Sequence, residues 1–222
     1  MCASPRLALI DYDTGNLHSA CKGLEVAGAT VEIISDPRGL ECFDGLVLPG
    51  DGAFDPAIQE LRRRGFVEPL HKAIAQGTPF LGICIGLQLL FDRSEEGQDA
   101  GLGIIAGHVA RFQAEPRLTI PHMGWNQLQF TQQQAILWQG IEVDPWVYFV
   151  HAYHGVPTDP DWIAATVRHG HQTVVAAVAR DQVMATQFHP EKSGLVGLKM
   201  LQNFVEYVIQ GKELSQGIMA PK

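Results

Sequence analysis

The chain has 222 residues, 46% of them hydrophobic and 18% charged, with a formal net charge of −8 at pH 7. This composition indicates a globular protein with a sizeable core, and the acidic balance argues against binding to nucleic acid. The first apolar run, residues 7–10, is too short for a signal peptide, and no run reaches the roughly 18 apolar residues of a membrane span.

The first hundred residues alternate between short apolar runs and stretches with helical spacing. We expect strands at 7–11, 31–35, 45–48 and 80–83, and helices at 15–28, 54–64, 66–76 and 85–91. Gly77 follows the third helix as a C-terminal cap. This alternation predicts an α/β fold, an open and mostly parallel sheet flanked by helices on both faces.

Helical spacing disappears from about residue 101 to residue 188. Strands are expected at 109–112, 127–130, 146–150 and 163–167, and as a pair at 173–179 and 182–188. The pair turns at Arg180-Asp181, and an amphipathic helix at 195–209 ends the pattern. Because no linker or repeat divides the halves, we expect one domain over residues 1–222, whose C-terminal half extends the same sheet with antiparallel strands.

The stretch GICIG, residues 82–86, places one cysteine between two glycines where a strand meets a helix. Such a sharp junction can push the side chain of Cys84 into a strained, exposed position, as in a nucleophile elbow. The start of a helix also favours the thiolate. The alternative is a buried cysteine that acts as a small apolar residue, which is the commoner case for a single cysteine.

The stretch TQFHPEKSG, residues 186–194, supplies a base and a residue to orient it. Proline ends the strand and fixes a turn, so that Glu191 can bind one imidazole nitrogen of His189 and direct the other toward Cys84. Carboxyl ends of parallel strands meet at one edge of a sheet, where sites form. Taken alone, the tripeptide could equally be an ordinary surface turn.

The stretch LPGDGAF, residues 48–54, also follows a strand. Its two glycines allow backbone amides to turn toward a developing oxyanion. It does not fit a phosphate-binding loop, because no Gly-Lys-Ser/Thr follows. Alone, this turn is no more than a glycine-rich loop.

Together these stretches resemble the class I glutamine amidotransferases over nearly the whole chain. Six segments also resemble the glutaminase subunits of imidazole glycerol phosphate synthase: DYDTGNLHS, LPGDGAF, GICIGLQLLF, PHMGWN, YFVHAYH and FHPEKSG. The resemblance implies a flavodoxin-like sheet and an enzyme that hydrolyses glutamine to glutamate and ammonia. Cys84 would form a glutamyl thioester, His189 would move protons, and Glu191 would orient it.

The resemblance also implies the residues around the substrate. The amide of Ile85 and one from the turn Gly50-Asp51-Gly52 would hold the oxyanion, and Gln88 and Gly52 would bind glutamine. The family usually has valine at the position of Asp51. A carboxylate there would oppose an oxyanion unless it pointed away.

A partner is implied as well, the cyclase subunit of imidazole glycerol phosphate synthase, a β/α barrel. It would form a heterodimer with this chain and use the ammonia in histidine biosynthesis. The positions of subunit contact fall on four residues: Asn16, Trp125, Tyr148 and Lys192. The alternatives are an amidotransferase subunit of another synthase, a free-standing hydrolase, or a docking module without catalysis.

The remaining polar residues indicate no metal and no cofactor. Two pairs of histidines have metal-like spacing, but no cluster of carboxylates or cysteines completes a site. The four cysteines lack paired spacing, so we expect free thiols in a cytoplasmic protein. These cysteines are Cys2, Cys21, Cys42 and Cys84.

Overall fold

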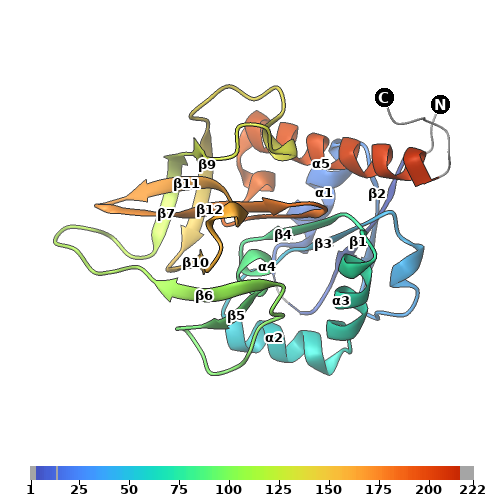
Figure 1. Cartoon of the computed structure of the whole chain (residues 1–222), viewed down its shortest axis with the longest axis horizontal. Helices are drawn as coiled ribbons and strands as arrows, with labels where there is room; N and C mark the ends of the chain where they lie inside the picture. Colours follow the sequence, from blue (N-terminus) through green and yellow to red (C-terminus); the bar gives the residue numbers. More distant parts are fainter. Residues whose placement is uncertain (1–3, 14, 216–222) are drawn as a thin grey trace.

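The computed structural model describes residues 4–13 and 15–215. Strands and helices alternate in the first half of the chain, and the second half is made mainly of strands before the long last helix (Figure 1). The helices are α1 (Leu17–Val26), α2 (Phe54–Arg63), α3 (Val67–Ala75), α4 (Ile85–Gln88) and α5 (Gly194–Ser215). The strands are β1 (Arg6–Ile10), β2 (Thr30–Ile34), β3 (Gly45–Leu48), β4 (Phe80–Ile83), β5 (Phe91–Ser94), β6 (Ile105–Arg111), β7 (His122–Gln127), β8 (Gln129–Phe130), β9 (Trp146–His151), β10 (Tyr153–Pro157), β11 (Ile163–His169), β12 (Gln172–Arg180) and β13 (Val183–Thr186). Short 3-10 turns lie at Leu40–Cys42, Ile136–Trp138, Pro160–Trp162 and Pro190–Lys192.

The main sheet has eight strands in the order β2-β1-β3-β4-β13-β12-β11-β8. The first five strands in this order, β2, β1, β3, β4 and β13, run parallel to one another. The last three, β12, β11 and β8, are added by antiparallel pairing, which confirms the expected fold class. In β13, Thr186 lies opposite Ile83 of β4. The loops after β4 and β13 therefore leave the sheet side by side, at its carboxyl edge.

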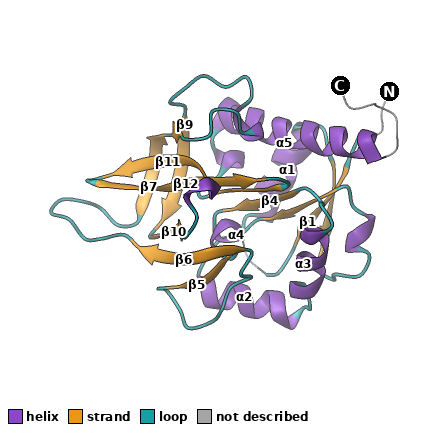
Figure 2. Ribbon diagram, viewed as in Figure 1, coloured by secondary structure: helices purple, strands orange, loops and turns teal. Residues whose placement is uncertain are grey.

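Helices cover both faces of this sheet (Figure 2). Residues of α1 and α5 pack on one face with Leu7 and Leu9 of β1. Residues of α2, α3 and α4 pack on the other face with Ala8 and Ile10 of the same strand. This alternation along β1 follows from the period of two in a strand, and it buries β1 on both sides.

Most expected elements are confirmed within one to three residues at their ends. The cap at Gly77 is confirmed in detail: φ is +88°, and its N–H donates to the carbonyl of Ile74 at 3.0 Å. The hairpin turn is confirmed too, with Asp181 at φ +52° between β12 and β13. Among the described residues, no helix is long and apolar enough to cross a membrane.

One expectation about the elements was wrong. The helix expected at 85–91 ends at Gln88, and Phe91 begins β5. Residues 85–91 are buried on all sides, so apolar spacing cannot separate helix from strand there. The expected antiparallel extension of the main sheet is present, and the C-terminal half also contributes to two smaller sheets. Strands β10, β6 and β5 form a second sheet, and β7 pairs with β9 in a third.

Candidate active site

Cys84 occupies a strained junction between β4 and α4, with φ +55° and ψ −106°. A positive φ is costly for a residue other than glycine. The glycines on either side are needed for close backbone approach. A Cβ atom at Gly82 would lie 2.8 Å from the carbonyl oxygen of Gly86, and one at Gly86 would overlap the carbonyl of Leu48. The elbow inferred from GICIG is therefore present.

The expected exposure of Cys84 was wrong, since its exposed fraction is only 4%. The glycine turn after β3 packs against the elbow. A Cβ at Gly50 would lie 2.9 Å from the Cβ of Ile85, the first residue of α4. The turn therefore packs against Ile85, the residue that follows Cys84. Cys21 and Cys42 are free as well, whereas Cys2 lies outside the described residues.

His189 and Glu191 form a buried pair beside this elbow. His189 Nδ1 lies 2.7 Å from Glu191 Oε1, and the two side chains are 1% and 0% exposed. Burial disfavours a charge on His189, but its interactions with Cys84 and Glu191 outweigh burial and raise its pKa from 6.5 to about 10. His189 Nε2 is buried without a hydrogen bond of ordinary geometry among the described residues. Hydrogen bonds of catalytic groups are often long before substrate binds.

Asn16 also binds the carboxylate of Glu191. It stands at the N-cap of α1 in the left-handed conformation, φ +73°, and its side chain makes no capping bond. Instead its Nδ2 donates to Glu191 Oε1, the oxygen that also faces His189. Asn16 therefore contacts the buried His189–Glu191 pair. Its expected role at a subunit interface did not indicate this contact.

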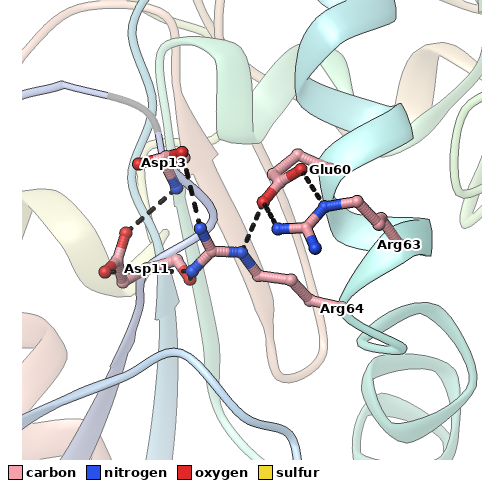
Figure 3. Close-up of polar contacts among 5 residues, drawn as sticks. All are labelled: Asp11, Asp13, Glu60, Arg63 and Arg64. Atoms are coloured by element: carbon pink, nitrogen blue, oxygen red, sulfur yellow. Dashed lines mark hydrogen bonds and ion pairs between the residues drawn. The ribbon is translucent and has the colours of Figure 1, made fainter.

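Arg64 fastens the loop that carries Asn16 to the end of α2 (Figure 3). Its Nε donates to Glu60 Oε1 at 2.6 Å, and its Nη1 donates to the carbonyl of Asp11 at 2.9 Å. Its Nη2 lies 3.7 Å from a carboxylate oxygen of Asp13. Helix α2 begins directly after the glycine turn. One helix thus joins that turn to the loop of Asn16.

Asp51 turns its carboxylate back onto its own turn. Its Oδ1 accepts a hydrogen bond from the N–H of Gly52 at 2.9 Å, and the residue is exposed. A Cβ at Gly15 would lie 3.8 Å from Asp51 Oδ2. The carboxylate therefore faces Gly52 and the loop before α1.

Gln88 lies one helical turn beyond Cys84 and is buried. Its Nε2 donates to the carbonyl of Tyr153 at 3.2 Å, while its Oε1 is buried without a partner among the described residues. A buried acceptor without a donor is costly. Gln88 is thus poised to accept from a ligand.

Three residues expected at a subunit interface gather beside the buried pair. Trp125 of β7 lies opposite Tyr148 of β9, with ring centroids 6.2 Å apart. The carbonyl of Tyr148 accepts from the N–H of His189 at 3.0 Å. Lys192 is exposed next to Glu191. Trp125 is 52% exposed, and Met123 and Leu195, which the sequence did not indicate, are 64% and 85% exposed.

Sequence reasoning missed two further polar groups. Gln187 is fully buried and its Nε2 lies 3.7 Å from Cys84 Sγ. Its position two residues before His189 was the available signal. His122 and His151 form a buried pair, 3.1 Å between ring nitrogens, of which the spacing of histidines gave no hint. Within residues 4–13 and 15–215, no group of three His, Cys, Asp or Glu side chains is arranged to hold a metal ion.

Comparison with known proteins agrees with this geometry. The family profile "Glutamine amidotransferase class-I" matches residues 8–208. A protein of Synechococcus sp. strain JA-3-3Ab, named imidazole glycerol phosphate synthase subunit HisH, is 67% identical over 91% of this chain and 94% of its own. The protein of the same name from strain JA-2-3B'a(2-13) is 63% identical over 95% of this chain and 96% of its own.

Solved structures share the fold. The structure of PurLQS from Thermotoga maritima, 19% identical, matches 92% of this chain and 99% of that chain with a TM-score of 0.73. The glutaminase domain of a Trypanosoma brucei CTPS, 16% identical, matches 93% of this chain and 94% of that chain with a TM-score of 0.63. The chain belongs to the class-I glutamine amidotransferase family. Within that family, it is a relative of the HisH subunits.

Proposed function

We propose that this chain hydrolyses glutamine to glutamate and ammonia through a thioester on Cys84, as the glutaminase subunit of imidazole glycerol phosphate synthase. The observation that carries the chemistry is the buried pair His189–Glu191, 2.7 Å apart, beside a cysteine at a strained elbow. A nucleophile, a base and an orienting carboxylate are the parts that acyl transfer requires.

The proposed reaction has two halves. The proton of Cys84 passes to His189 Nε2, and the resulting thiolate attacks the side-chain carbonyl carbon of glutamine. His189 returns that proton to the departing nitrogen, so ammonia leaves and a glutamyl thioester remains. Water then gives a proton to His189 and attacks the thioester, and the proton finally returns to the sulfur as glutamate departs. Glu191 stabilises the imidazolium throughout, in keeping with the raised pKa of His189, about 10.

The oxyanion and the substrate have candidate partners next to the elbow. The amide of Ile85 and one from Gly50–Gly52 are the proposed oxyanion donors, supported by the close approach of Gly50 to Ile85. The unpartnered Oε1 of Gln88 is the proposed acceptor for the ammonium group of glutamine. The ammonium group would donate a hydrogen bond to the buried oxygen of Gln88.

The partner is proposed to be the cyclase subunit, a β/α barrel, bound over the exposed apolar side chains near the triad. Trp125, Met123 and Leu195 are large and exposed there, as expected of an interface centre. Asn16, Tyr148 and Lys192 surround the same place. Ammonia released at Cys84 would pass directly to the partner for histidine biosynthesis, and we propose that the complex is cytoplasmic.

The experiment is a glutaminase assay of Cys84→Ala with and without the cyclase and its ligand. We expect no glutamate formation from Cys84→Ala, while binding to the cyclase is retained. Cys42→Ala is the matched control, because Cys42 is an exposed free thiol outside the site. Turnover by Cys84→Ala in the complex would contradict the proposal. Equal rates of the wild-type chain alone and in the complex would favour a free-standing hydrolase.

A further inference from the structure

Gln187 is a buried amide with no role in the chemistry described above. It follows β13 directly, two residues before His189, and its exposed fraction is 0%. Its Nε2 lies 3.7 Å from Cys84 Sγ, within reach of a hydrogen bond to sulfur. A buried amide must find partners, and here one of them is the reacting atom.

Hydrogen-bonding logic fixes which end of the Gln187 amide faces the sulfur. Gln88 Nε2 lies 3.2 Å from the carbonyl of Tyr153, which can only accept, so the NH₂ group of Gln88 must face that carbonyl. The same nitrogen lies 3.1 Å from Gln187 Oε1. If the side-chain amide of Gln187 were rotated by half a turn, its NH₂ group would face the NH₂ group of Gln88. Its own NH₂ group therefore faces Cys84.

A chain of histidines supports the carbonyl of Tyr153. His151 Nδ1 lies 2.7 Å from that oxygen and must donate to it. His151 Nε2 then accepts from His122 Nδ1 at 3.1 Å, and His122 Nε2 accepts from Asn126 Nδ2 at 3.1 Å. The orientation of the Asn126 amide follows from a separate contact, because its Nδ2 also donates to the carbonyl of Arg168 at 2.8 Å.

The chain works only with neutral imidazoles, because a proton on His151 Nε2 would face the donor of His122. Burial provides this condition: it lowers the pKa of His122 to about 4 and that of His151 to about 3. Near neutral pH, every group in the chain thus has one consistent orientation. The amide of Gln187 is oriented through Gln88, whose NH₂ group also donates to the carbonyl of Tyr153.

We propose that Gln187 is a further catalytic residue, which donates an N–H to Cys84 Sγ and stabilises the thiolate that attacks glutamine. This inference rests on the proposed role of Cys84 as nucleophile. A hydrogen bond to an ionised sulfur is stronger than one to a thiol, so the donor favours the attacking form. His189 and Glu191 are the titratable groups beside the thiolate, and Gln187 adds a neutral donor to them.

The test uses Gln187→Met, which keeps an unbranched side chain of similar length and removes the donor. In the complex with cyclase and its ligand, we expect kcat/KM for glutamine to fall at least ~10-fold and the acid limb of its pH profile to rise by at least half a pH unit. Alkylation of Cys84 by iodoacetamide, followed on its peptide by mass spectrometry, should show the same upward shift.

Two further variants separate chemistry from packing. Gln187→Glu keeps the size and the acceptor facing Gln88 but sets a carboxylate against the sulfur, so we expect it to be at least as impaired. Gln182→Met is the matched control on the same hairpin. Its amide donates to the carbonyl of Ile74 at 2.6 Å, at the far end of β13. We expect Gln182→Met to keep the pH profile even if it lowers the melting temperature.

Each outcome decides between the two proposals. Full activity and an unmoved acid limb in Gln187→Met, with Cys84→Ala inactive, would overturn the role of Gln187 and leave the nucleophile intact. Activity near the wild-type level in Gln187→Glu would show that the residue only fills space and would also overturn the role. Turnover by Cys84→Ala would instead remove the proposed function itself.

Discussion

The amide of Asn16 donates to the carboxylate of Glu191 instead of capping its own helix. Asparagine at an N-cap usually bonds to the first turn, so the bond to Glu191 takes the place of a stabilising contact. Glu191 in turn accepts from His189. The N-terminus of α1 is therefore coupled to the proposed base, at a place where the partner is expected to bind.

This coupling predicts the effect of Asn16→Gly. Glycine accepts the left-handed backbone without strain, so the variant removes the amide alone. We expect kcat at saturating cyclase to fall several-fold to ~10-fold, because Glu191 loses one of two groups that orient it. Steady-state glutaminase assays and a thermal melt check this. Wild-type kcat in Asn16→Gly would mean that the contact has no part in catalysis.

Glu191→Gln should alter both rate and pH dependence. The carboxylate helps to raise the pKa of His189 to about 10, so its loss should move the basic limb of kcat/KM to lower pH. We expect a smaller loss of kcat than in His189→Ala, since Glu191 acts through His189. A pH–rate profile of both variants measures this. An unmoved basic limb would contradict the coupling.

The same pKa gives a prediction about stability. The pKa of His189 is higher in the folded protein than the ordinary 6.5, so its stabilisation is complete below pH 6.5 and is lost as pH rises toward about 10. We expect the free energy of unfolding of wild type to fall more steeply over this range than that of Glu191→Gln. Urea titrations at several pH values give both slopes. Equal slopes would count against a charged His189.

His122 predicts the opposite dependence on the acid side. Its folded pKa, about 4, lies below 6.5, so its stabilisation is present above pH 6.5 and is lost as pH falls toward 4. In His122→Phe, the new ring can still stack on Phe149. Between pH 5 and 6.5, we expect the slope of the unfolding free energy against pH to be smaller in this variant than in wild type, by up to ~1.4 kcal/mol per pH unit. Above pH 7.5 both slopes should agree, which is the internal control. Identical slopes throughout would contradict the buried neutral imidazole.

The proposed reactive groups could be inferred from the sequence because each lies in a local pattern. Cys84 stands between close-packed glycines, and His189 and Glu191 share one turn. The bond of Asn16 to Glu191 joins residues 175 positions apart, and that of Gln187 to Cys84 joins residues 103 apart. Such contacts depend on how strands and helices pack, which periodicity does not specify.

The same limit explains the other errors. Glycines near a cysteine indicate an elbow but not what covers it, and here the turn of Gly50 packs on Ile85. Residues 85–91 are uniformly buried, so their spacing could not reveal that the helix ends at Gln88. The organisation of residues 1–222 as one domain stays a prediction.

Asp51→Val tests how the glycine turn is controlled. The carboxylate of Asp51 accepts from the N–H of Gly52 at 2.9 Å, so it holds one candidate oxyanion donor away from the reaction. That N–H would have to turn toward the substrate before it could bind an oxyanion. We expect the wild-type chain alone to be at least ~100-fold slower than the activated complex, within the ~2.7–4 kcal/mol typical of one such donor.

In the ligand-bound complex, Asp51→Val should change turnover by less than tenfold, because the carboxylate faces Gly52 and the loop of Gly15 instead of the thioester. In the chain alone, the variant should be several-fold faster than wild type, since the N–H of Gly52 is released. Glutamate formation measured in both states gives the two ratios. A gain of tenfold or more in the complex, about 1.4 kcal/mol of barrier, would mean that the carboxylate opposes the oxyanion during the reaction itself.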